Sequence, residues 1–65
     1  MTKAQSLGEK DGEAARLKAL KRNRVLTKFG AYNEAAKCFV KYIDKKTLSG
    51  ADIAEYTTAF LSKVL

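Results

Sequence analysis

The sequence contains no histidine, no proline and no tryptophan, and it has a single cysteine. Without histidine, the usual general base at neutral pH and the commonest metal ligand are both missing. One cysteine cannot supply a disulfide or a pair of thiolate ligands, and the sequence also lacks a glycine-rich phosphate loop and clustered carboxylates. These absences argue against an enzyme, and we expect neither a cofactor nor a metal site.

Long apolar runs are missing as well. The longest, at 38–40 and 59–61, have three residues each, whereas a membrane-spanning helix needs roughly 20 apolar residues. No apolar segment follows Met1, which excludes the pattern of a secretory signal. Because a single unpaired thiol suits a reducing compartment, we expect a cytoplasmic protein that makes no membrane contact.

The chain is short, which limits how much core it can build. A domain of 65 residues buries only about 60% of the surface that its unfolded chain exposes. Disulfides and metals, the usual supports of small domains, are excluded here, so self-association is the remaining one. We therefore expect a homodimer.

Acidic residues are scarce in the middle of the chain. Residues 16–46 carry ten cations and two anions, a net charge of +8, whereas the two ends together carry −2 of the total of +6. A polarised charge of this kind attracts polyanions and is the electrostatic footprint of a nucleic-acid binder.

The cations follow two helical patterns. The segment 16–28 holds six cations and no anion, and since it consists largely of helix-forming residues without glycine or proline, it predicts one continuous basic helix. In a following helix, lysines recur every four residues and share an outer face. Arginine can contact phosphate in a bidentate manner and lysine as a point charge. The predicted nucleic-acid-binding residues are Arg16, Lys18, Lys21, Arg22, Arg24, Lys28, Lys37, Lys41 and Lys45.

The sequence predicts an all-α fold, a small three-helix bundle made of a basic N-terminal helix and an αα-hairpin. We expect helices at 12–29, 33–46 and 50–64, with 6–11 as a weaker extension of the first. Residues 1–11 are expected to be partly disordered and 12–65 to form a single domain.

Capping residues set these boundaries. Ser6 and Glu9 have the spacing of a capping box, but two nearby glycines weaken a helix start there. Gly30 has the character of a residue that ends a helix, Asn33 is a good N-cap, and Ser49 begins a second capping arrangement.

Helical spacing places apolar side chains on one face of each helix. Leu17 and Leu20 fall outside this face, and we interpret them as the interface of the homodimer. Cys38 lies at the edge of the apolar face and is expected to pack as a small hydrophobic residue. The predicted core is Leu26, Phe29, Phe39, Ile43, Ile53, Phe60 and Leu61.

A short motif, Gly30-x-Tyr32-x-x-Ala35-x-x-x-Phe39, resembles the join between the two helices of a tetratricopeptide repeat. The resemblance covers about ten residues and has no second copy, so it does not imply the stacked peptide groove of repeat arrays. It implies an αα-hairpin with close packing at Ala35.

Two binding functions remain open. In the first, the cations contact the phosphates of DNA or RNA with little sequence preference, because few side chains can read bases. In the second, the module is an adaptor or inhibitor of phage or plasmid type that docks on an acidic protein, with Leu17 and Leu20 as anchors. Phosphate binding should weaken steeply with salt, whereas protein docking should depend on the leucines.

Overall fold

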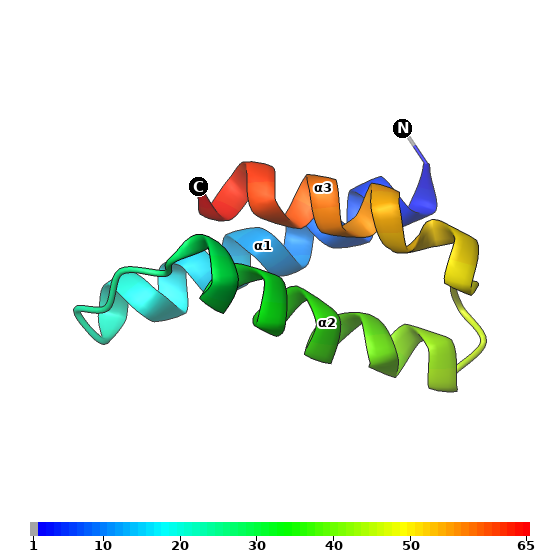
Figure 1. Cartoon of the computed structure of the whole chain (residues 1–65), viewed down its shortest axis with the longest axis horizontal. Coiled ribbons are helices and arrows are strands. Elements are labelled where there is room, and N and C mark those ends of the chain that lie inside the picture. Colours follow the sequence, from blue (N-terminus) through cyan, green and yellow to red (C-terminus); the bar gives the residue numbers. More distant parts are fainter. Residues whose placement is uncertain (1) are drawn as a thin grey trace.

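A computed structural model describes residues 2–65, and Met1 lies outside the described residues. It contains three α-helices, and none of the described residues forms a strand. The predicted all-α three-helix bundle is confirmed. Figure 1 shows α1 and α3 lying beside each other with α2 beneath them. The helices are α1 (Lys3–Lys21), α2 (Lys28–Asp44), a short 3-10 helix η1 (Gly50–Asp52) and α3 (Ile53–Val64).

Helix α1 begins nine residues before the predicted start at residue 12. The Thr2 hydroxyl accepts a hydrogen bond from the Gln5 backbone N–H at 3.2 Å, and the Gln5 side chain accepts one from the Thr2 backbone N–H at 3.0 Å. This reciprocal pair is a capping box, and it lies one turn before Ser6, which has the same capping-box spacing in the sequence. The start at residue 12 was therefore wrong, and residues 3–11 form the first half of α1.

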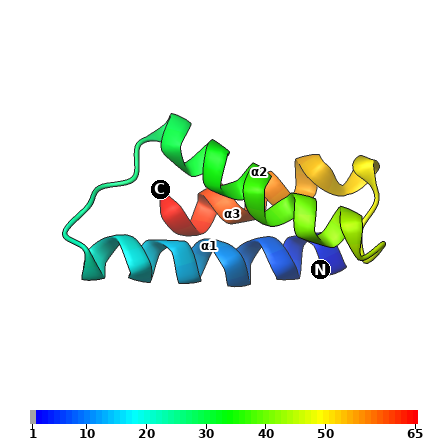
Figure 2. The same cartoon turned by 90° about the horizontal axis from the view of Figure 1, so that it is seen from below.

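Helix α1 ends at Lys21, well before the predicted end at residue 29. Asn23 adopts a positive φ of 53°, its backbone N–H donates to the Leu20 carbonyl, and the Arg24 backbone N–H donates to the Ala19 carbonyl at 2.8 Å. These two bonds define a Schellman motif, and asparagine tolerates the left-handed conformation that the motif requires. The continuous basic helix over 16–28 was therefore a wrong prediction (Figure 2).

Helix α2 begins at Lys28 rather than near Asn33, because the Thr27 hydroxyl accepts a hydrogen bond from the Gly30 backbone N–H at 3.1 Å. Gly30 thus lies in the first turn of α2 and does not end a helix. The join implied by the tetratricopeptide resemblance is absent at this point, although Ala35 is fully buried as the motif indicated.

Ser49 opens the last helical segment, as the sequence predicted. Its backbone N–H and hydroxyl donate to the Asp52 carboxylate at 3.0 and 3.3 Å. Residues 50–52 form η1 and lead directly into α3. The predicted start at residue 50 is confirmed, with a 3-10 turn in place of the first α-helical turn.

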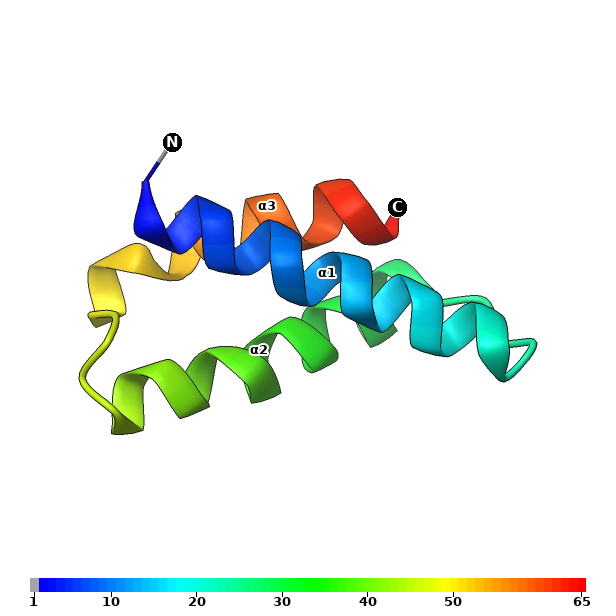
Figure 3. The ribbon, with the colours of Figure 1, turned by 180° about the vertical axis from the view of Figure 1, so that it is seen from behind.

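The main contact of the bundle joins α1 to α3 and depends on small residues (Figure 3). Ala4, Gly8 and Gly12 recur every four residues on α1 and are buried. A Cβ atom at Gly8 would overlap the Tyr56 carbonyl oxygen, and one at Gly12 would lie 2.5 Å from the Phe60 carbonyl oxygen. The glycines that counted against a helix in the sequence analysis allow the two backbones to approach.

Replacing Gly8 by alanine is therefore expected to destabilise the protein. Alanine favours a helix by about 1 kcal/mol over glycine, but overpacking against a fixed backbone costs about 1–3 kcal/mol. We expect a net loss and a lower melting temperature by circular dichroism. Gly50→Ala is the control, since no atom lies within 4 Å of its added Cβ. A higher melting temperature for Gly8→Ala would mean that the helices are not in close contact.

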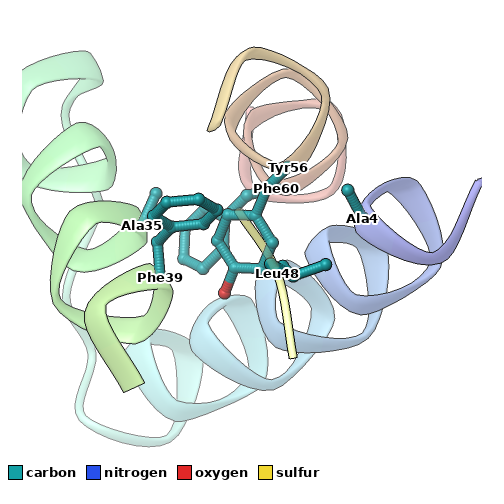
Figure 4. Close-up of a cluster of buried hydrophobic side chains, with 6 residues drawn as sticks. All are labelled: Ala4, Ala35, Phe39, Leu48, Tyr56 and Phe60. Carbon is teal, nitrogen blue, oxygen red and sulfur yellow. The ribbon is translucent and has the colours of Figure 1, made fainter. Parts of the chain in front are cut away.

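The core lies where the three helices meet (Figure 4). Tyr56 and Phe60 of α3 are fully buried, and Phe39 of α2 packs against Tyr56 with ring centroids 5.3 Å apart. The prediction that Phe39 and Phe60 belong to the core is confirmed. Tyr56 and Leu48 are also buried, and the predicted core did not include them.

The rest of the predicted core is less buried. Leu26 and Leu61 are half-buried. Ile43, Ile53 and Phe29 are exposed, so the prediction that they belong to the core was wrong. Phe29 was expected at the end of the first helix, but because α1 stops at Lys21 and α2 begins at Lys28, Phe29 lies in the first turn of α2. Ile43 and Ile53 lie in the last turn of α2 and the first turn of α3.

Candidate nucleic-acid interface

A surface hollow of about 210 Å³ lies between the C-terminal half of α1 and the N-terminal half of α2. Lys18 and the helix-capping Arg22 enter it from α1, Arg24 from the connector, and Lys37 from α2. The only acidic side chain in its lining is Glu34. The other lining residues are Ala15, Ala19, Leu26, Gly30 and Asn33.

The chain reversal at Asn23 creates this cluster. Lys18 and Arg22 are one helical turn apart and share a face of α1. Since α1 stops and the connector 22–27 turns back toward α2, Arg24 lies at the same hollow as Lys37, thirteen positions later in the sequence. A continuous helix would have carried Arg24 away from α2.

The structure brings four of the nine predicted binding residues together and leaves the others outside the hollow. Arg16 donates to Glu13 at 2.6 Å on α1, so its charge is partly neutralised. Lys41 and Lys45 continue from Lys37 at four-residue spacing along α2 and are exposed. Lys21 and Lys28 are also exposed but do not line the hollow.

The hollow keeps most of its positive charge. Lys37 lies 3.9 Å from Glu34, and both side chains are solvent-accessible, so this ion pair is weak. Within residues 2–65, Lys18, Arg22 and Arg24 form no ion pair. An anion that entered the hollow would meet several donors.

The two predicted interface leucines are placed on α1. Leu17 and Leu20 are 53% and 59% exposed. As expected, both lie outside the core. They do not line the basic hollow, and their role as an interface stays a prediction.

One polar cluster, centred on Asp11, was not predicted from the sequence. Asp11 lies in the middle of α1, and its carboxylate accepts hydrogen bonds from the Tyr42 hydroxyl at 2.7 Å and the Tyr56 hydroxyl at 2.5 Å. The cluster thus links all three helices. The sequence signal for this cluster is the position of Asp11 beside Gly12, on the face of α1 formed by small residues.

The environment of this cluster keeps both phenols neutral. Burial, and then the hydrogen bond to Asp11, raise the pKa of Tyr56 and raise that of Tyr42 from 10.0 to about 12. Since neutral tyrosine is favoured in the folded state, this contribution to stability is present below pH 10 and is lost as the pH rises toward 12. Both hydroxyl protons are used in hydrogen bonds within the protein.

Cys38 packs beside this cluster. Burial first, and then the charge of Asp11, raise the pKa of its thiol. A raised pKa lowers the thiolate fraction, and thiolate is the reactive form. The residue therefore has the character of a packed small side chain rather than a nucleophile.

A second hollow, of about 480 Å³, lies between α1 and α3. Its charged lining residues are Glu9 and Glu55, and none of the predicted binding residues reaches it. Among residues 2–65, no three potential metal ligands gather at one place, and no helix is long and apolar enough to cross a bilayer.

Comparisons with protein-family models, with curated proteins and with solved structures found no match to this chain.

Proposed function

We propose that the protein binds nucleic acid through phosphate contacts at the basic hollow between α1 and α2, without catalysis. The observation that carries this proposal is the convergence of Lys18, Arg22, Arg24 and Lys37 around one hollow with a single acidic residue. Cations that are not neutralised within the protein release counterions from a bound polyanion.

The contact would extend along α2. Lys41 and Lys45 follow Lys37 at four-residue spacing, so the basic surface continues from the hollow along one side of the helix. Phosphates spaced along a duplex or a single strand fit such a row better than one small anion does. The rings of Tyr42 and Tyr56 pack in the core cluster and cannot stack on bases. Since the basic surface has few side chains that read bases, we expect little base preference. A single unpaired cysteine suits a reducing compartment, and we propose that the protein acts in the cytoplasm.

Changing Arg22, Arg24 and Lys37 together to glutamine is expected to weaken binding to labelled DNA or RNA and to flatten its salt dependence. Each lost phosphate contact lowers the log–log salt slope by about 0.9 on B-form DNA, so three contacts account for about 2 to 3. Fluorescence anisotropy from about 50 to 200 mM salt measures both quantities.

The matched control removes three charges elsewhere, at Lys3, Lys10 and Lys63, which do not line the hollow. It should retain most of the affinity. Equal losses in the two variants would show that only net charge matters and not the hollow. Absence of binding by the unmodified protein at about 50 mM salt, where electrostatic binding is strong, would contradict the proposal.

A second candidate, docking on an acidic protein, is supported by the exposure of Leu17 and Leu20 on α1. Such docking would be lost on changing both leucines to serine and would tolerate moderate salt. Phosphate binding would show the opposite behaviour.

A further inference from the structure

Helix α2 has an apolar stripe that no part of the described chain covers. Its members are spaced by three, four, four and three residues, which keeps them on one face of a helix. All are exposed, from 37% for Ile43 to 82% for Phe29, and none is charged. We call these residues the α2 stripe: Phe29, Tyr32, Ala36, Val40 and Ile43.

The chain exposes more surface than a folded monomer of its mass usually does. Its accessible surface is 4641 Å² for 7.2 kDa, whereas a folded monomer of this mass exposes about 4100 Å². The excess, about 500 Å², is more than half of the roughly 800 Å² that each partner contributes to a standard interface.

The α2 stripe is symmetric about Ala36. Phe29 and Ile43 lie seven residues to either side of it, and Tyr32 and Val40 lie four residues to either side. A two-fold axis through Ala36 would therefore place Phe29 against Ile43 of a second copy and Tyr32 against Val40 of that copy. A two-fold interface must be self-complementary in this way. The small side chain of Ala36 would let the two α2 helices approach at the centre of the interface. Toward its ends, each aromatic ring would meet a smaller aliphatic side chain of the other copy.

Charges at the ends of α2 follow the same symmetry. Lys28 and Asp44 each lie eight residues from Ala36, on opposite sides. The two-fold axis therefore brings opposite charges to the same level of the paired helices. The lysine row of Lys37, Lys41 and Lys45 lies off the stripe, so pairing of the stripes would leave the basic surface accessible.

We propose that the α2 stripe is the interface of an antiparallel, two-fold symmetric homodimer. This assignment is independent of nucleic-acid binding and moves the dimer interface from Leu17 and Leu20 on α1 to the exposed apolar residues of α2. Two copies would carry two basic hollows related by the same axis.

Disulfide trapping tests the geometry directly. In a Cys38→Ala background, Ala36→Cys should form a cross-linked dimer on mild oxidation, because the two-fold axis brings both copies of this position within the roughly 4.4–6.8 Å between Cα atoms that a disulfide requires. Leu17→Cys in the same background is the matched control and should form no cross-linked dimer on oxidation. Efficient cross-linking at Leu17 but not at Ala36 would overturn the proposal.

Sedimentation of the protein with its native cysteine gives an independent measurement. From about 1 µM to about 1 mM, a range that covers weak to moderate dissociation constants, the unmodified protein should dimerise, and Val40→Glu should shift it to monomer while keeping its helical circular dichroism. Added salt should strengthen the dimer, since each copy carries a charge of +6 and screening reduces their repulsion. A monomer at all of these concentrations would overturn the proposal.

Discussion

Replacing Phe60 by alanine is expected to unfold the protein. Phe60 is fully buried, its ring centroid lies 6.2 Å from that of Tyr56, and its backbone packs against Gly8 and Gly12 of α1. Loss of a buried phenylalanine costs about 3–5 kcal/mol, which equals the roughly 3–5 kcal/mol that a core of this size supplies. Far-ultraviolet circular dichroism should show loss of helix at room temperature.

Leu65→Ala is the matched control for this prediction. Leu65 is 67% exposed at the end of the chain, and surface substitutions usually change stability by less than about 0.5 kcal/mol. Its spectrum and melting temperature should match those of the unmodified protein. If Phe60→Ala also kept both, the core described here would be incorrect.

Replacing Asp11 by alanine is expected to cost about 2–4 kcal/mol, because a buried donor left without a partner costs about 1–3 kcal/mol, and the half-buried Tyr42 hydroxyl should cost less than the Tyr56 hydroxyl. Two donors are affected, the hydroxyls of Tyr42 and Tyr56. Asp11→Asn retains an oxygen acceptor and should lose less. Urea unfolding followed by circular dichroism gives the free energy of unfolding for each variant.

A double-mutant cycle separates the hydrogen bonds from other effects of the substitution. Asp11→Ala combined with Tyr42→Phe should be non-additive by about 0.5–3 kcal/mol, since the second change removes one of the unpaired donors. Glu13→Ala is the control, because its ion pair with Arg16 is solvent-accessible and worth at most about 1 kcal/mol. Equal losses for Asp11→Ala and Glu13→Ala would show that the cluster does not stabilise the fold.

Periodicity predicted the fold class because it depends on residues close in sequence. The apolar spacing of α2 and α3 correctly selected Phe39 and Phe60, and the Ser49 cap located the last helix. The end of α1 was missed because Gly30 is the commoner helix-ending residue, whereas Asn23 stands within a run of helix formers. The hydrogen bond of Thr27 then decides where α2 begins.

The sequence predicted which cations belong to the candidate site but not how they are arranged in space. Charge counting identified all the cations, but their grouping requires the reversal at Asn23, which brings Arg24 to the same hollow as Lys37. The hydrogen bonds of Asp11 could not be predicted from the sequence for a similar reason. Its two partners, Tyr42 and Tyr56, lie 31 and 45 positions away along the chain, and local patterns carry no information on such distant pairs.

The contact of Gly8 and Gly12 with α3 also affects how the chain folds. Gly8 meets Tyr56 and Gly12 meets Phe60, so the largest helix contact joins segments separated by nearly fifty residues, with α2 between them. Closing that long loop costs entropy before its contacts form. Helices α1 and α2 alone share few contacts and would not hold together while α3 is unfolded. The bundle should therefore fold in one cooperative step, and more slowly than helical proteins whose neighbouring helices pack in sequence order.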